Sequence, residues 1–147
     1  MSIFVVDRKG GKPRPFYPAA TRVEVSPDGR LVMVSSRDER TRSWTTAIVP
    51  LGGGEPLYLL EGDMGQDSFR PIHWTPDSRG LAWVDPVSVM KIMTRTIDGQ
   101  PPRLLTEFKD GPRIVDFAWS PDGVQLAIER ANETSDIVML TGVNGGS

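Results

Sequence analysis

Short segments in which apolar and polar residues alternate recur along the chain, and turn-forming residues separate one segment from the next. Alternation places successive side chains on opposite faces of a strand, whereas the apolar face of a helix repeats about every three to four residues. The pattern therefore predicts an all-β fold that is built from short strands.

One stretch fits both patterns. Residues 117–128 read FAWSPDGVQLAI, and Val124, Ala127 and Ile128, with Ala131 beyond them, have the spacing of an amphipathic helix after a Ser-Pro-Asp-Gly start signal. The same residues also fit a strand, a tight turn and a second strand. Comparison with the rest of the chain decides between the two interpretations.

An internal repeat favours the hairpin. Ser26–Gly29 recurs as Thr75–Ser78 and as Ser120–Gly123, and prolines 27, 76 and 121 are 49 and 45 positions apart. Alternating segments flank each turn: 23–25, 72–74 and 117–119 precede it, and 31–34, 81–84 and 126–128 follow it. Aligned on the turns, Leu126 corresponds to Leu31 and Leu81, so we expect a strand there.

Further segments complete the unit. Third segments follow at 44–49, 89–93 and 137–140, and fourth segments, after a glycine turn, at 57–60 and 103–106. Four short strands in about 45 residues are typical of a β-propeller blade. We expect a single propeller segment over 1–147, with a partial blade at 1–18, blades at 19–61 and 68–107, and a three-strand blade at 113–141.

The turn residues have a structural explanation. Proline presets the backbone, aspartate accepts hydrogen bonds from its own backbone, and glycine tolerates positive φ. A calcium-binding array of aspartates is the alternative, but the aspartates occur once per blade and no acidic neighbours converge on them. The residues interpreted as structural are Pro27, Asp28, Gly29, Pro76, Asp77, Pro121, Asp122 and Gly123.

Alternation also assigns the faces of each first strand. One face carries large apolar residues, which we expect to fill the space between blades: Val23, Val25, Ile72, Trp74, Phe117 and Trp119. The other face carries Glu24, His73 and Ala118.

These motifs carry a resemblance. WSPDG, the following LA and the later Asp/Asn-Gly turn resemble the WD40-like repeat of TolB-type propellers, which also occurs in the propellers of prolyl-oligopeptidase and tricorn-type peptidases. The stretch LLTEFKDGPRIVDFAWSPDGVQLAIERANETSDIVML is similar to the C-terminal propeller blade of bacterial serine/threonine kinases and winged-helix regulators. Ser78 and Val25 depart from the repeat. The resemblance implies a fold and says little about activity.

About three blades cannot close a ring, because closed propellers have about four to eight. Two explanations are open: the chain is the C-terminal portion of a longer propeller, or assembly completes the ring. In either case the segment 14–17 could supply the outer strand that a terminal blade lacks. We expect a homodimer that completes a ring of about six blades.

Composition excludes several classes of function. The net charge of −2 gives no basic field for nucleic acid, and the absence of cysteine excludes disulfides and zinc–thiolate sites. We expect no cofactor, no metal and no membrane insertion, and the first residues do not resemble a signal peptide. The compartment is left open, although relatives of this family are often extracytoplasmic.

Candidate binding residues lie at the blade connections and at the single histidine. Asp67 and Arg70 belong to one connection, and Lys109 and Arg113 to the next, which we expect at the same rim of the channel. His73 is either a packed, channel-lining residue or a ligand-binding one. No Gly-x-Ser-x-Gly elbow accompanies it, so we expect no catalytic residue and no enzyme activity.

We therefore expect a non-enzymatic propeller scaffold for a protein or peptide partner, which the resemblance places as a sensor module of a larger signalling protein. The alternatives are an accessory propeller that filters substrate for a peptidase, and an isolated fragment without activity.

Overall fold

The computed structural model describes residues 2–18, 20–61, 64 and 70–132. This part of the chain forms twelve strands and no helix, as the alternation predicts. The strands are β1 (Ile3–Val5), β2 (Arg14–Tyr17), β3 (Arg22–Val25), β4 (Leu31–Arg37), β5 (Trp44–Pro50), β6 (Tyr58–Glu61), β7 (Ile72–Trp74), β8 (Gly80–Val84), β9 (Lys91–Thr96), β10 (Arg103–Glu107), β11 (Arg113–Trp119) and β12 (Leu126–Ala131).

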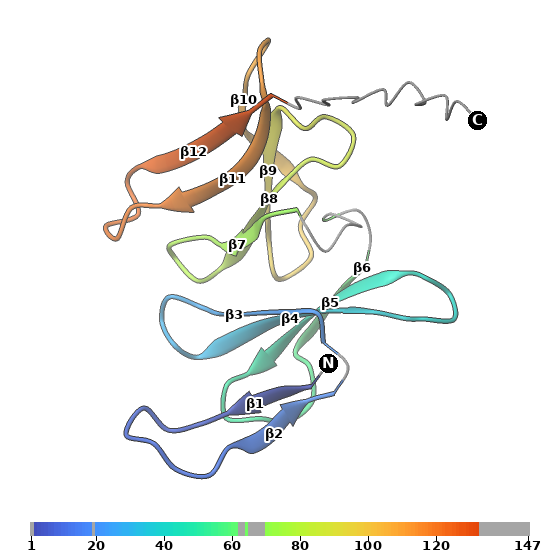
Figure 1. Cartoon of the computed structure of the whole chain (residues 1–147), viewed down its shortest axis with the longest axis vertical. Coiled ribbons are helices and arrows are strands. Elements are labelled where there is room, and N and C mark those ends of the chain that lie inside the picture. Colours follow the sequence, from blue (N-terminus) through green and yellow to red (C-terminus); the bar gives the residue numbers. More distant parts are fainter. Residues whose placement is uncertain (1, 19, 62–63, 65–69, 133–147) are drawn as a thin grey trace, which may run out of the picture.

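The strands form two four-stranded and two two-stranded antiparallel sheets (Figure 1). We call the sheet β3–β4–β5–β6 the first blade and the sheet β7–β8–β9–β10 the second blade. The N-terminal hairpin is β1–β2, and the C-terminal hairpin is β11–β12. The prediction of a hairpin at 117–128 is confirmed, whereas the expected strand at 137–140 lies outside the described residues.

The three Ser/Thr-Pro-Asp turns share one geometry. In each, the backbone N–H of the first residue donates to the carbonyl five positions on, which belongs to Leu31, Gly80 or Gln125. Leu31 therefore corresponds to Gly80 and Gln125, and the predicted alignment of Leu31 with Leu81 and Leu126 is wrong by one residue. Because side chains alternate along a strand, that one position reverses the face of every residue that follows.

The turn aspartates act as predicted within their own turns. Oδ1 of Asp28, of Asp77 and of Asp122 accepts a hydrogen bond from the backbone N–H two positions on, at 3.0, 3.0 and 3.1 Å. The hydroxyl of Ser26, Thr75 or Ser120 donates to the same oxygen and is the largest cause that holds the pKa of that aspartate below its usual value.

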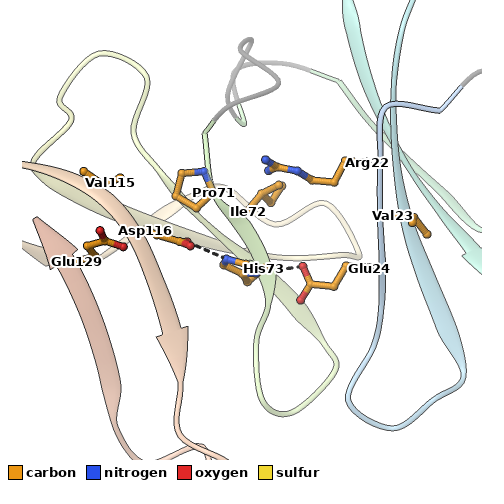
Figure 2. Close-up of a pocket in the computed structure, with 9 residues that line it drawn as sticks. All are labelled: Arg22, Val23, Glu24, Pro71, Ile72, His73, Val115, Asp116 and Glu129. Atoms are coloured by element: carbon orange, nitrogen blue, oxygen red, sulfur yellow. Dashed lines mark hydrogen bonds and ion pairs between the residues drawn. The ribbon is translucent and has the colours of Figure 1, made fainter. Parts of the chain in front are cut away.

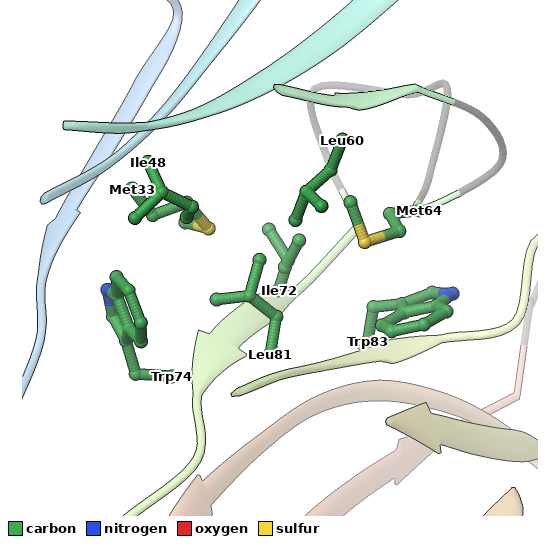
Figure 3. Packing of buried hydrophobic residues seen from close by; sticks show 8 residues of the cluster. All are labelled: Met33, Ile48, Leu60, Met64, Ile72, Trp74, Leu81 and Trp83. Carbon is green, nitrogen blue, oxygen red and sulfur yellow. The ribbon is translucent and has the colours of Figure 1, made fainter. Parts of the chain in front are cut away.

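Both faces of each blade are buried against a neighbour. Between the two blades lies a cluster to which both contribute: Met33, Ile48, Leu60, Met64, Ile72, Trp74, Leu81 and Trp83 (Figure 3). Val32, Val34, Ala47 and Val49 on the opposite face of the first blade pack against the N-terminal hairpin. Ala82, Val84 and Ile92 on the opposite face of the second blade pack against the C-terminal hairpin. Each large side chain that is fully buried contributes about 1.5–3 kcal/mol.

The sheets are therefore stacked in chain order. We call the face of a sheet toward the sheet before it in sequence its preceding side, and the face toward the next sheet its following side. Turns of successive sheets also touch. The hydroxyl of Ser78 accepts a hydrogen bond from the backbone N–H of Asp28 at 3.0 Å. Gly123 lies so close to Pro76 that a Cβ on it would be 2.6 Å from the proline Cβ.

Candidate binding site on the inner strands

The first strands of the three successive sheets, β3, β7 and β11, supply the site. Trp74 ties β7 to β3: its indole Nε1–H donates to the backbone carbonyl of Glu24 at 3.0 Å, and its backbone N–H donates to Glu24 Oε1 at 3.3 Å. Both bonds bury polar groups of one sheet against the next, so they fix the position of the Glu24 carboxylate relative to β7.

His73 links all three strands. Its Nδ1 lies 3.2 Å from Glu24 Oε2, and its Nε2 lies 3.3 Å from Asp116 Oδ1 (Figure 2). The ring also packs edge-on against Phe117, with centroids 5.0 Å apart and an interplanar angle of 89°. The imidazole is therefore held between two carboxylates and lies nearly perpendicular to the ring of Phe117.

This position favours the charged imidazole. A neutral imidazole has one N–H, whereas the imidazolium can donate to both carboxylates at once. The hydrogen bond with Glu24 is the largest cause that raises the pKa of His73, burial opposes it, and Asp116 adds to it. Protonation therefore strengthens the link between the inner strands.

Arg22 approaches the same place from the start of β3. Its guanidinium donates to the backbone carbonyl of Arg70, and Arg70 in turn donates to the carbonyl of Asp85 at 3.4 Å. Burial is the largest cause that lowers the pKa of Arg22, and Glu24 and Asp116 oppose it. The two arginines join the entry of β7 to its neighbours.

A hollow of about 440 Å³ opens among these groups (Figure 2). Residues of β3, of β7 and its entry, and of the C-terminal hairpin line it: Arg22, Val23, Glu24, Pro71, Ile72, His73, Val115, Asp116 and Glu129. A second hollow of about 350 Å³ lies on the other side of His73, toward the turns, and Pro27, Pro76 and Pro121 are among its lining residues. Both hollows share Glu24 and His73.

The predicted candidates are brought together only in part. His73 lies at the centre of the hollow. Arg70 is not a lining residue, but its backbone carbonyl accepts a hydrogen bond from Arg22, which is one. Lys109 is exposed in the connection between β10 and β11, Arg113 begins β11, and neither is a lining residue. Asp67 lies outside the described residues.

Sequence reasoning missed Glu24, Asp116 and Arg22 as members of the site. For Asp116 the sequence contained a signal. Asp116 lies two residues before Ala118 and therefore on the same face of β11. The bulge between Ile114 and Asp116 offsets the strand pairing there, and the alignment on the turns placed Ala118, not Asp116, beside His73.

Carboxylates flank both nitrogens of the imidazole. Both nitrogens of His73 face carboxylates, so neither is directed at a hydroxyl that it could activate. In the described part of the chain, no three histidine or acidic side chains come together so that they could hold a metal ion. The same residues include no helix that is long and apolar enough to cross a membrane.

One comparison with solved structures bears on the architecture. No family model matches the chain, and no curated protein does. Among solved structures, putative TolB from Agrobacterium tumefaciens superposes with a TM-score of 0.64 and 22% sequence identity, over 88% of this chain and 47% of that one. An uncharacterized protein from Listeria monocytogenes matches with a TM-score of 0.45 and 13% identity, over 80% of this chain and 48% of that one. The chain spans about half the length of these structures. The first of them shows that its fold is that of a TolB-like β-propeller region.

Proposed function

We propose that this chain is a non-enzymatic propeller scaffold that binds a protein or peptide partner at the hollow beside His73. The observation that carries the proposal is the convergence of charged side chains from three successive sheets on one open hollow of about 440 Å³. Binding sites are concave and hold a few polar groups in fixed positions. The hydrogen bonds of Glu24 and His73 supply that fixed arrangement.

The charge of the hollow suggests the chemistry of the partner. Glu24, Asp116 and Glu129 contribute three carboxylates, against His73 and the partly buried Arg22. Asp116 and Glu129 are exposed, so they are the groups that an incoming ligand meets. A peptide that presents a lysine, an arginine or a free amino terminus is complementary to this surface.

A peptide array tests the proposal, with basic, neutral and acidic sequences equally represented and the labelled protein as probe. We expect retention on basic peptides, and at least a tenfold weaker affinity for the best of them when Asp116→Asn and Glu129→Gln are combined, about 1.4 kcal/mol. Glu55→Gln, in the exposed turn between β5 and β6, is the matched control and should bind as the wild type does. Equal retention on acidic and basic peptides would contradict the proposal.

Membership in a larger signalling protein is part of the same proposal, and the resemblance of the last blade to kinase and regulator propellers supports it. In such a protein the scaffold would report occupancy of the hollow to an attached domain. Ligand-dependent protection of β3, β7 and β11 in hydrogen exchange would support a sensor, and protection confined to the exposed loops would count against it.

A further inference from the structure

We infer that two copies of this chain close a ring, and that the C-terminal hairpin of one copy and the N-terminal hairpin of the other form a single four-stranded blade. The inference rests on the faces and edges of the two hairpins. The surfaces it uses also carry Val23, Asp116 and Glu129, which line the proposed ligand hollow.

The two hairpins are complementary halves of one unit. The strands β11 and β12 flank a Ser-Pro-Asp-Gly turn, as the inner pairs β3–β4 and β7–β8 do. In the N-terminal hairpin, Val6 precedes the turn, as Leu51 and Ile97 do between the outer strands of the two blades. An inner pair at one end and an outer pair at the other add up to one blade.

Each hairpin covers only part of the blade beside it. On the preceding side of the first blade, the N-terminal hairpin covers β4 and β5 through Ile3, Phe16 and Tyr17. The inner strand β3 is left uncovered there, and its Val23 and Val25 are 46% and 47% exposed. The missing cover is an inner pair of strands.

The C-terminal hairpin offers a matching surface on its following side. Ala118 and Ala127 are paired across β11 and β12, both are exposed, and they belong to the lining of a hollow of about 290 Å³. Two small side chains there leave room for the larger Val23 and Val25 of a second copy. Within one chain the equivalent pair His73–Ala82 packs against Phe117 in the same way.

The outer half shows the same complementarity. On the preceding side of the N-terminal hairpin, Phe4 and Val6 are 56% and 53% exposed. In the joined blade these two side chains would lie over the following side of the second blade of the other copy, outside the area that the C-terminal hairpin covers. Exposed apolar side chains would then be buried on both halves.

A second copy of this chain is an occupant that carries both matching surfaces, an inner pair and an outer pair of strands. The described sheets of one copy amount to two blades and two half-blades, so two copies would supply about six blades, within the range of closed propellers. The contact is head to tail, and such contacts form closed rings when the rotation between copies allows it.

The register of the new strand pair follows from the two blades. Met33 pairs with Ile48 in the first blade, and Ala82 pairs with Thr94 in the second. Counting from the turns, Ala127 corresponds to Met33 and Ala82, and Ile3 corresponds to Ile48 and Thr94. Ala127 of one copy is therefore expected opposite Ile3 of the other.

Disulfide trapping tests that register, and the chain contains no cysteine of its own. Ile3→Cys and Ala127→Cys, placed on separate chains and mixed, should give a linked heterodimer on oxidation, because β1 and β12 of one chain lie far apart (Figure 1). Ile3→Cys mixed with Ala118→Cys is the matched control, since Ala118 lies one strand further from the edge, and it should link at least tenfold less.

The mass in solution tests the assembly. Light scattering at micromolar concentration and above should give twice the 16.2 kDa of one chain. Val23→Glu combined with Val25→Glu should give a folded monomer, because both side chains are exposed in the single chain. A monomeric wild type, an open series of larger masses, or equal linking of both cysteine pairs would overturn the inference. So would pairing of β12 with residues 137–140 of its own chain, since it would leave Ala127→Cys unlinked.

Discussion

The hydroxyl of Ser78 lies 3.0 Å from the backbone nitrogen of Asp28 and accepts its hydrogen bond, so the turn of the second blade holds the turn of the first. Ser78 occupies the position that glycine occupies in the other two turns, and it adopts their left-handed conformation, with φ of 59°. Serine at this position therefore has a backbone strain that glycine would avoid, and it makes a hydrogen bond between the two blades.

Substitution of Ser78 separates these two contributions. Ser78→Ala keeps the left-handed strain and loses the hydrogen bond, so we expect about 1 kcal/mol less stability. Ser78→Gly loses the same bond but also relieves a strain of about 1–2 kcal/mol, so it should be close to the wild type. Urea denaturation of the three proteins measures the difference, and equal stability of the alanine variant and the wild type would contradict it.

Gly29 and Gly123 form a matched pair for the second contact between turns. Both have φ of 72°, but a Cβ on Gly29 would meet nothing within 4 Å, whereas a Cβ on Gly123 would meet Pro76 at 2.6 Å. Gly29→Ala should cost about 1 kcal/mol for the left-handed backbone. Gly123→Ala should cost at least about 1 kcal/mol more, because the ring of Pro76 must move. If thermal unfolding shows equal losses, the two turns do not pack as described.

His73 should make stability depend on pH. Its pKa is raised in the folded protein, so its contribution is fully present below the unfolded value near 6.5 and is lost as the pH rises through the folded pKa. The stability difference between the wild type and His73→Gln should therefore shrink as the pH rises from about 6 to about 8. Urea denaturation across that range measures it, and a constant difference would refute it.

The folded pKa can be measured directly, because the chain has one histidine and hence one imidazole set of proton resonances. Glu24→Gln should lower this pKa more than Asp116→Asn does, because the hydrogen bond with Glu24 is the largest cause of the shift. The reverse order in an NMR titration would assign the dominant contact to Asp116.

Trp74 and Trp119 occupy equivalent places, and their indole N–H groups have different surroundings. Trp74 Nε1 donates to the Glu24 carbonyl, whereas Trp119 Nε1 is buried and has no partner among the described residues. Trp74→Phe should therefore destabilise the protein by about 1 kcal/mol more than Trp119→Phe. Denaturation of the two variants checks this, and equal losses would mean that the indole bond contributes nothing net.

Turn chemistry and alternation were sufficient to predict most of the strands. The segment expected at 89–93 forms a strand at Lys91–Thr96, and the one expected at 137–140 lies outside the described residues. Leu31 was misaligned with Leu81 because apolar residues were matched instead of the turn hydrogen bonds. Those hydrogen bonds show that Leu31 corresponds to Gly80. Strand pairing depends on the backbone, so a position where one copy has leucine and another glycine cannot be aligned by hydrophobicity.

The site was harder to predict, because its members come from three sheets. Alternation placed Glu24 and His73 on one face, but nothing local says that a carboxylate in one blade meets an imidazole 49 positions later. Only the stacking of β3 on β7 brings them together. Asp116 required the bulge in β11 as well.

The contacts between turns also bear on how such a chain could grow. A copy of the second blade placed after it would set Ser78, instead of Gly123, beside Pro76. The contact between the first and second turns therefore differs from the contact between the second and third, although the turn sequences are almost the same. Duplication of the second blade would therefore create a mismatched junction at Pro76.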